Sequence, residues 1–170
     1  MIRALLTAAP LALALLVALP AAAAPLARGI DADQIVIDKS ERTLTVFWHG
    51  VPLKVYRVAL GDDPVAPKRR QGDQRTPEGR YTVSKRLENS TFHLALYLSY
   101  PNADDRARAR AERENPGGAI EIHGLRPGYE WLGSAHTLFD WTDGCIAVTN
   151  TEIEELWRVT PIGTPVEIRP

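Results

Sequence analysis

The 170-residue chain contains 20 Lys and Arg, 21 Asp and Glu and one cysteine, and its formal net charge at pH 7 is −1. Charges of both signs are scattered along the sequence, which argues against nucleic acid or an anionic membrane surface as a partner. The length fits one domain with a sizeable core, so we expect binding at a local site.

The N-terminus has the parts of a secretory signal peptide: a positively charged start, an apolar run over 4–19 and small residues that allow cleavage after Ala23. The run is shorter than the roughly 20 residues that a membrane-spanning helix needs. We therefore expect export to the periplasm or cell envelope, with no membrane span after cleavage. The predicted parts are a signal peptide (1–23), a short irregular leader (24–33) and one folded domain (34–170).

Short runs rich in β-branched and aromatic residues predict most of the elements. His49-Gly50 between two of these runs indicates a tight hairpin turn, so we expect His49 to be a solvated bystander. Thr76–Gly79 has Pro and Gly where a type I turn favours them, and it follows a loop over 61–75. The predicted strands are 34–38, 42–48, 52–60, 80–85, 92–100, 119–122, 146–148 and 166–168.

Strict alternation over 92–100 indicates a half-buried strand, and the face that carries Tyr97 could line a cleft, whereas His93 is expected to be exposed. The stretch 104–114 favours a helix with almost no large apolar side chain, which should lie on the surface as a candidate flap beside the site. The stretch 152–159 predicts an amphipathic helix that begins at the cap Thr149-Asn150. Ile153, Leu156 and Trp157 are expected to face inward.

Strands outnumber helices in this pattern, so the predicted fold class is mainly β: a β-sandwich or a partly closed barrel with one or two short helices. The connection over 124–140 is long and rich in Gly, Pro and aromatic residues. Long connections of this kind usually cover functional sites, and its aromatic residues argue against disorder.

Cys145 follows Gly144 and precedes a short apolar run, which makes it a candidate nucleophile. Thiolates attack carbonyls well, and a glycine lets backbone N–H groups turn toward a developing oxyanion. His123, 22 residues earlier at the end of a predicted strand, is the candidate base, and His136 in the connection could bind substrate. A single cysteine in an exported chain cannot form an internal disulfide, so it is retained either for chemistry or as a small buried apolar residue.

Two motifs carry a family resemblance. Ile122-His123-Gly124 and the stretch Thr142–Asn150 resemble the active-site signature of the L,D-transpeptidase catalytic domain, the YkuD family. Lys68, Gly72 and 76–81 are similar to the residues that precede a strand in that family. The match extends over 34–168, nearly the whole mature chain.

The resemblance implies an L,D-transpeptidase-like β domain that acts on peptidoglycan stem peptides, with no cofactor and no metal; a wall-linked protein is one candidate acceptor. Cys145 would be the nucleophile and His123 the base, while the Gly124 carbonyl would orient the imidazole. Gly144 and Cys145 would provide backbone donors for the oxyanion, and Asn150 would fix the loop.

Two positions depart from the commonest pattern of the family. Asp143 and Ala147 stand where a histidine and an arginine are usual, and a carboxylate next to the nucleophile raises a thiol's pKa unless a cation compensates. Binding of a substrate carboxylate would then fall to another cation. The candidate substrate-binding residues are Asp143, His136, Lys68, Arg126 and Tyr97.

Several alternatives stay open. With an amine as acceptor the protein would be a transpeptidase; with water it would be a hydrolase, either an L,D-carboxypeptidase or an amidase that detaches a wall-linked protein. A non-catalytic wall-binding module with a vestigial cysteine is a reading of another class. A zinc site built from His123, His136, Asp140 and Cys145 uses the right ligand types, but no two of them have a short ligand-pair spacing.

Overall fold

The computed structural model describes residues 24–170. The predicted signal peptide lies outside these described residues. In the part of the chain that is described, no helix has the length and apolar character needed to cross a membrane.

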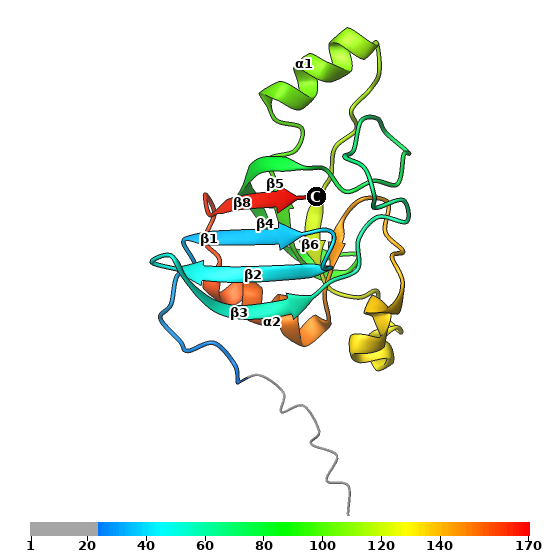
Figure 1. The fold of residues 1–170 in the computed structure, drawn as a ribbon. Coiled ribbons are helices and arrows are strands. Elements are labelled where there is room, and N and C mark those ends of the chain that lie inside the picture. The colour runs from blue at the N-terminus through cyan, green and yellow to red at the C-terminus, as the bar shows by residue number, and fades with distance from the viewer. Residues whose placement is uncertain (1–23) are drawn as a thin grey trace, which may run out of the picture.

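Within residues 24–170, eight strands form one mixed sheet in the order β3-β2-β1-β8-β4-β5-β6-β7 (Figure 1). Neighbouring strands are antiparallel except in the pairs β1–β8 and β6–β7. The strands are β1 (Gln34–Asp38), β2 (Thr43–Trp48), β3 (Val51–Arg57), β4 (Gly79–Ser90), β5 (His93–Leu98), β6 (Glu121–His123), β7 (Ile146–Ala147) and β8 (Pro165–Arg169).

The predicted mainly β fold is confirmed, and the sheet is open. Two isolated bridges, Ala59 with Ala147 and Gly61 with Thr142, bring the segment that follows β3 to the far end of the sheet, next to β7. The hairpin between β2 and β3 forms as expected, because His49 and Gly50 have the positive φ values, 51° and 74°, that its tight turn needs. The His49 side chain is exposed.

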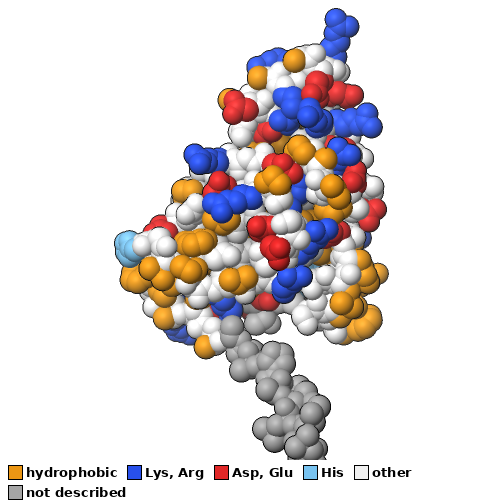
Figure 2. Space-filling view, in the orientation of Figure 1, with side chains coloured by type: hydrophobic (Ala, Val, Ile, Leu, Met, Phe, Trp, Pro, Cys, Tyr) orange, Lys and Arg blue, Asp and Glu red, His pale blue; other side chains and the backbone are white. Residues whose placement is uncertain are grey.

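Two helices differ in how much they bury. α1 (Ala103–Glu112) projects from the sheet in Figure 1 and buries only Asp105 and Ala109, as its lack of large apolar residues predicts. Charged side chains of both signs crowd over it in Figure 2. α2 (Asn150–Val159) is capped by a reciprocal bond between Thr149 and Glu152, and it buries four side chains. These are Ile153, Glu155, Leu156 and Val159.

The core contains side chains from every strand together with Ile153 and Leu156 of α2. Fully burying such an aliphatic side chain is worth about 1.5–3 kcal/mol, so the alternating apolar pattern of the strands fixes which face of the sheet turns inward. Trp157, which was expected to face inward, is only partly buried and packs against this core.

Three segments differ from the sequence-based expectation. β4 continues to Ser90 instead of ending near residue 85, because β5 pairs with its polar second half. The connection over 124–140 contains the 3-10 helix η1 (Glu130–Leu138), which is kinked at Gly133. Thr76–Gly79 forms no hydrogen-bonded turn.

The leader is irregular but held in place. Arg158 of α2 donates to the Leu26 carbonyl at 3.0 Å, and the Ala32 N–H donates to the Val159 carbonyl at 2.7 Å. The segment before β1 therefore lies against α2.

Candidate active site

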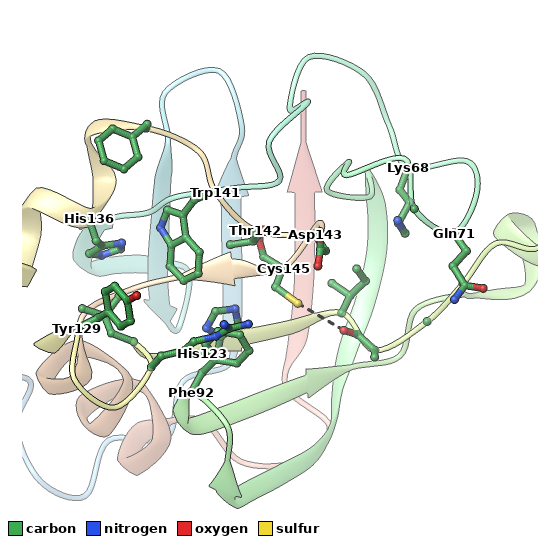
Figure 3. Close-up of a pocket in the computed structure, with 18 of the residues that line it drawn as sticks. Lys68, Gln71, Phe92, His123, Tyr129, His136, Trp141, Thr142, Asp143 and Cys145 are labelled. Atoms are coloured by element: carbon green, nitrogen blue, oxygen red, sulfur yellow. Dashed lines mark hydrogen bonds between the residues drawn. The ribbon is translucent and has the colours of Figure 1, made fainter.

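Cys145 and His123 lie in one pocket of about 1100 Å³ (Figure 3). Four parts of the chain form its walls: the loop before β4, the turn between β4 and β5, the segment around β6, and the stretch from η1 to β7. The bridges that follow β3 hold the last of these stretches against the first half of the chain. The pocket is thus assembled from segments that are distant in sequence.

His123 is the last residue of β6, and its ring is almost completely buried. Nδ1 lies 2.7 Å from the Gly124 carbonyl oxygen. Because a carbonyl can only accept, Nδ1 carries the proton and Nε2 is left with the lone pair that a base needs. Burial lowers the pKa of His123 to about 4, although the hydrogen bond to Gly124 raises it, so the imidazole is neutral at neutral pH.

The backbone after His123 is fixed from α2. Asn150 accepts a hydrogen bond from the Leu125 N–H at 2.7 Å through Oδ1. A Cβ on Gly124 would lie 2.6 Å from the same oxygen, so only glycine fits between His123 and this anchor. Asn150 therefore holds the turn that carries the Gly124 carbonyl.

Cys145 lies directly before β7, and its thiol donates to the Ala119 carbonyl at 3.4 Å (Figure 3, dashed line). Burial raises the pKa of the Cys145 thiol to about 11, and the negative charges of Glu121 and Asp143 act in the same direction. The resting site therefore contains a neutral thiol and a neutral imidazole, and the thiol proton points away from the base.

Thr142 organises the turn in front of the cysteine. Its hydroxyl donates to the Cys145 carbonyl at 2.7 Å and accepts from the Gly144 N–H at 3.1 Å. The Gly144 N–H, expected as an oxyanion donor, is thus already engaged by Thr142. The Cys145 N–H is the remaining candidate of the two.

Gly144 lies where three backbone segments meet. Its φ of +119° is accessible almost only to glycine, and an added Cβ would lie 2.4 Å from the Arg75 carbonyl oxygen. Gly61 is equally constrained, because its Cβ would lie 2.1 Å from the Gln74 oxygen and 3.1 Å from the Gly144 Cα. Glycine beside the cysteine is therefore a packing requirement.

Four of the five candidate substrate-binding residues line the pocket, namely Asp143, His136, Lys68 and Arg126. Tyr97, the fifth, lies opposite Glu121 in the β5–β6 pair and is not among the residues that line the pocket. The buried Lys68 ammonium is paired with Asp73 at 2.7 Å. The Arg126 guanidinium lies over the Phe92 ring, 5.0 Å from its centroid.

Aromatic residues that sequence reasoning did not assign form the wall beside the base. The Phe92 ring lies 4.2 Å from the His123 ring, and the Trp141 ring lies 5.9 Å from it on an edge-to-face contact. His136 is buried next to Trp141. Trp141 stands in a loop and has no periodicity that would reveal its direction. Phe92 falls in the alternating pattern over 92–100, which indicates a strand face and not a pocket wall.

Ala147 and Asp140 have backbone and side-chain contacts that lie outside the site arrangements considered above. Ala147, at the position where arginine is usual, is fully buried and exchanges backbone hydrogen bonds with Ala59. Asp140 accepts from Arg42 at 2.9 Å and from the Leu60 N–H at 2.8 Å, so both carboxylate oxygens are engaged outside the zinc arrangement considered above. Across residues 24–170, no group of three or more His, Cys, Asp or Glu side chains is arranged to hold a metal ion.

Comparison with known proteins gives a consistent result. The family described as L,D-transpeptidase catalytic domain (YkuD) matches residues 32–168. YafK from Escherichia coli (strain K12), whose assignment as an L,D-transpeptidase is provisional, is 30% identical over 131 residues, which are 73% of this chain and 45% of YafK.

Solved structures share the fold. Pgp2 from Campylobacter jejuni, described as a helical cell shape determining protein, has a TM-score of 0.60 at 20% identity, over 83% of this chain and 48% of Pgp2. Bd1075 from Bdellovibrio bacteriovorus has a TM-score of 0.59 at 24% identity, over 82% of this chain and 48% of its own. An L,D-transpeptidase from Mycobacterium smegmatis has a TM-score of 0.56 at 16% identity, over 82% and 59%. This chain spans about half the length of YafK, Pgp2 and Bd1075.

Proposed function

The chain belongs to the L,D-transpeptidase catalytic domain family, and we propose that it is an exported cysteine acyltransferase that acts on peptidoglycan stem peptides. The observation that carries the proposal is the placement of Cys145 and His123 in one pocket, with the His123 Nδ1 proton held by the Gly124 carbonyl. That hydrogen bond leaves Nε2 as the nitrogen that can take the thiol proton.

The first half-reaction forms an acyl-enzyme. The thiol leaves the Ala119 carbonyl and turns toward His123, Nε2 takes its proton, and the sulfur attacks the carbonyl carbon of the third stem residue. The Cys145 N–H stabilises the oxyanion. When the tetrahedral intermediate collapses, the C–N bond breaks and the departing amine receives the proton from His123.

The second half-reaction regenerates the enzyme. An acceptor attacks the thioester carbonyl while His123, neutral again, takes its proton; the C–S bond then breaks and His123 returns the proton to the Cys145 sulfur. An amine acceptor gives a new peptide bond and makes the protein a transpeptidase. Water gives a free carboxylate and makes it a hydrolase.

The hydrolytic alternative rests on Asp143 and Ala147. The position of the usual arginine is here a buried alanine that cannot reach a substrate, so substrate contacts differ from those of the commonest pattern. Mass spectrometry of muropeptide products separates the two reactions. A transpeptidase makes dimers or exchanges the terminal residue, whereas a hydrolase makes only shorter species.

Replacement of Cys145 by Ala tests the nucleophile. The variant should lose both crosslinking and cleavage of muropeptides, and undiminished turnover would show that the assignment is wrong.

His123→Ala should lower turnover by at least about 100-fold, because a general base contributes that much or more. His93→Ala is the matched control, since the exposed His93 side chain contacts, within residues 24–170, only the carboxylate of Glu154. Equal losses in the two histidine variants would contradict the role of His123.

A further inference from the structure

Among residues 24–170, Asp143 is the one anionic side chain that lines the pocket. It is exposed, it lies two residues before Cys145, and it forms no hydrogen bond or ion pair with any residue in 24–170. In Figure 3 it stands between Cys145 and Lys68. An unpaired carboxylate at this point gives the wall beside the nucleophile a negative charge.

The neighbouring lysine does not neutralise that charge by pairing with it. The Lys68 ammonium lies 2.7 Å from Asp73, and both side chains are more than nine-tenths buried. Asp73 also accepts hydrogen bonds from the backbone N–H groups of Arg69 and Arg70 at 2.7 and 3.0 Å. Lys68 and Asp73 thus satisfy each other's charge, and their contacts stabilise the loop before β4.

The remaining cation of the lining lies beside the base. Arg126 stacks over Phe92, which in turn contacts His123, and it forms no ion pair within the described chain. The open charges of the pocket are therefore a carboxylate beside the thiol and a guanidinium beside the imidazole. A substrate that carries an ammonium near its reacting carbonyl would complement the first of them.

We propose that Asp143 is a specificity residue that binds a primary ammonium group of the substrate next to Cys145. The inference rests on the proposed function and adds the chemical class of the group that this side of the pocket takes. The ammonium could belong to the acyl donor, as a side-chain amine, or to the incoming acceptor. In the second case the ammonium first loses one proton to solvent; as the resulting amine attacks, the neutral His123 of the acyl-enzyme takes the second proton and passes it to the departing sulfur.

Binding of a cation at this point has a chemical consequence. The negative charges of Asp143 and Glu121 oppose thiolate formation at Cys145. An ammonium held by Asp143 would offset part of that field, so the correct substrate would ease ionisation of the thiol that attacks it.

A charge-selectivity measurement tests the carboxylate without any natural substrate. Cys145 is labelled with methanethiosulfonates that carry either an ethylammonium or an ethylsulfonate group. The rate with the cationic reagent is divided by the rate with the anionic one, and this ratio is divided by the same ratio for a small free thiol. We expect a preference for the cationic reagent of about 10-fold, as a unit charge a few ångströms away implies in partly hydrated surroundings. Asp143→Asn should remove it and Asp143→Glu should retain it.

Asp104→Asn is the matched control, because Asp104 is an exposed aspartate on the projecting helix α1. It should leave the ratio unchanged. Since Asp143 is exposed and unpaired, its variants should fold as the wild type does, which circular dichroism checks. A cationic preference that is equal in the wild type and in Asp143→Asn would overturn the proposal.

Two experiments with substrates identify whether the acyl donor or the acceptor carries the ammonium. If the acyl donor carries the ammonium, acetylation of the side-chain amine on the third residue of a stem peptide should raise KM about 10-fold in the wild type. The same acetylation should not raise KM in Asp143→Asn. If the acceptor carries it, Asp143→Asn should lower the ratio of aminolysis to hydrolysis about 10-fold and leave the donor KM unchanged. Substrate preferences that are independent of Asp143 in both experiments would overturn the ammonium assignment. Absence of any turnover by the wild type would instead contradict the proposed function, while the labelling result would stand by itself.

Discussion

The candidate pair His123 and Cys145 could be named from the sequence, but the hydrogen bonds around it could not. The spacing of His123 and Cys145 and the surrounding motifs indicated a pair, and the structure brings both side chains into one pocket. Nothing in the sequence says that the resting thiol donates to the Ala119 carbonyl, or that Thr142 engages the Gly144 N–H. These contacts depend on how separate loops approach one another.

The neutral state of the pair makes a testable difference to thiol reactivity. Because burial raises the pKa of Cys145 to about 11, alkylation by iodoacetamide in the absence of substrate should become about tenfold faster per pH unit and still rise above pH 9, where a thiol with the ordinary pKa of 9.0 levels off. A cysteine-containing peptide provides the reference curve. A rate that is already constant near neutral pH would instead indicate a preformed thiolate–imidazolium pair.

Among the elements, regular strands were the most predictable and irregular segments the least. Short runs of β-branched and aromatic residues marked β1 and β2, and alternating residues marked β5. The second half of β4 is polar and has no such pattern, and only its pairing with β5 makes it a strand. η1 escaped prediction because Gly133, at φ 49° and ψ −134°, interrupts its helical periodicity.

The close contact between the turn before Cys145 and the loop before β4 predicts a large effect of one methyl group. Gly144→Ala places Cβ against the Arg75 carbonyl at an unfavourable φ, so the free energy of unfolding should fall by about 3–5 kcal/mol, from strain and overpacking together. Gly163→Ala is the control: its φ is +94°, and no atom lies within 4 Å of the added Cβ. It should cost about 1–3 kcal/mol from backbone strain alone.

Urea denaturation followed by circular dichroism measures both changes. If the two glycine variants lost the same stability, the contact between Gly144 and Arg75 would be negligible, and the packing explanation for glycine beside the cysteine would be wrong.

In the molecule as a whole, Glu155 joins the leader, the sheet and α2. It accepts from the Lys54 ammonium at 2.6 Å and from the buried Tyr56 hydroxyl at 2.9 Å, and the Leu26 N–H donates to its other oxygen. The sequence pattern assigned α2 correctly but gave no hint that a glutamate on its inner face connects three parts of the chain.

Removal of this carboxylate should therefore destabilise the protein more than a neighbouring change. Glu155→Ala is expected to lower the free energy of unfolding by about 2–3 kcal/mol, because it deprives buried donors of their acceptor. Glu154→Ala should change it by no more than about 1 kcal/mol, since Glu154 is largely exposed and so is His93, with which it forms an ion pair. Equal effects of the two substitutions would show that Glu155 does not join these parts.

The stabilisation by Glu155 should also depend on pH. Burial raises the pKa of this carboxyl, but the hydrogen bonds from Lys54, Leu26 and Tyr56 lower it more, so it lies below the ordinary 4.5. Its contribution is present above that value and is lost as the pH falls further. Urea titrations of the wild type and Glu155→Ala should accordingly converge in acid.

The position of β8 constrains the order in which this protein can form. The last strand of the chain lies between β1 and β4, parallel to one and antiparallel to the other. Before residues 165–169 are available, β1–β3 and β4–β7 have no strand to join them, and the long-range pairing that completes the sheet is intrinsically slow. The sheet therefore cannot be completed until residues 165–169 are available to pair with both β1 and β4.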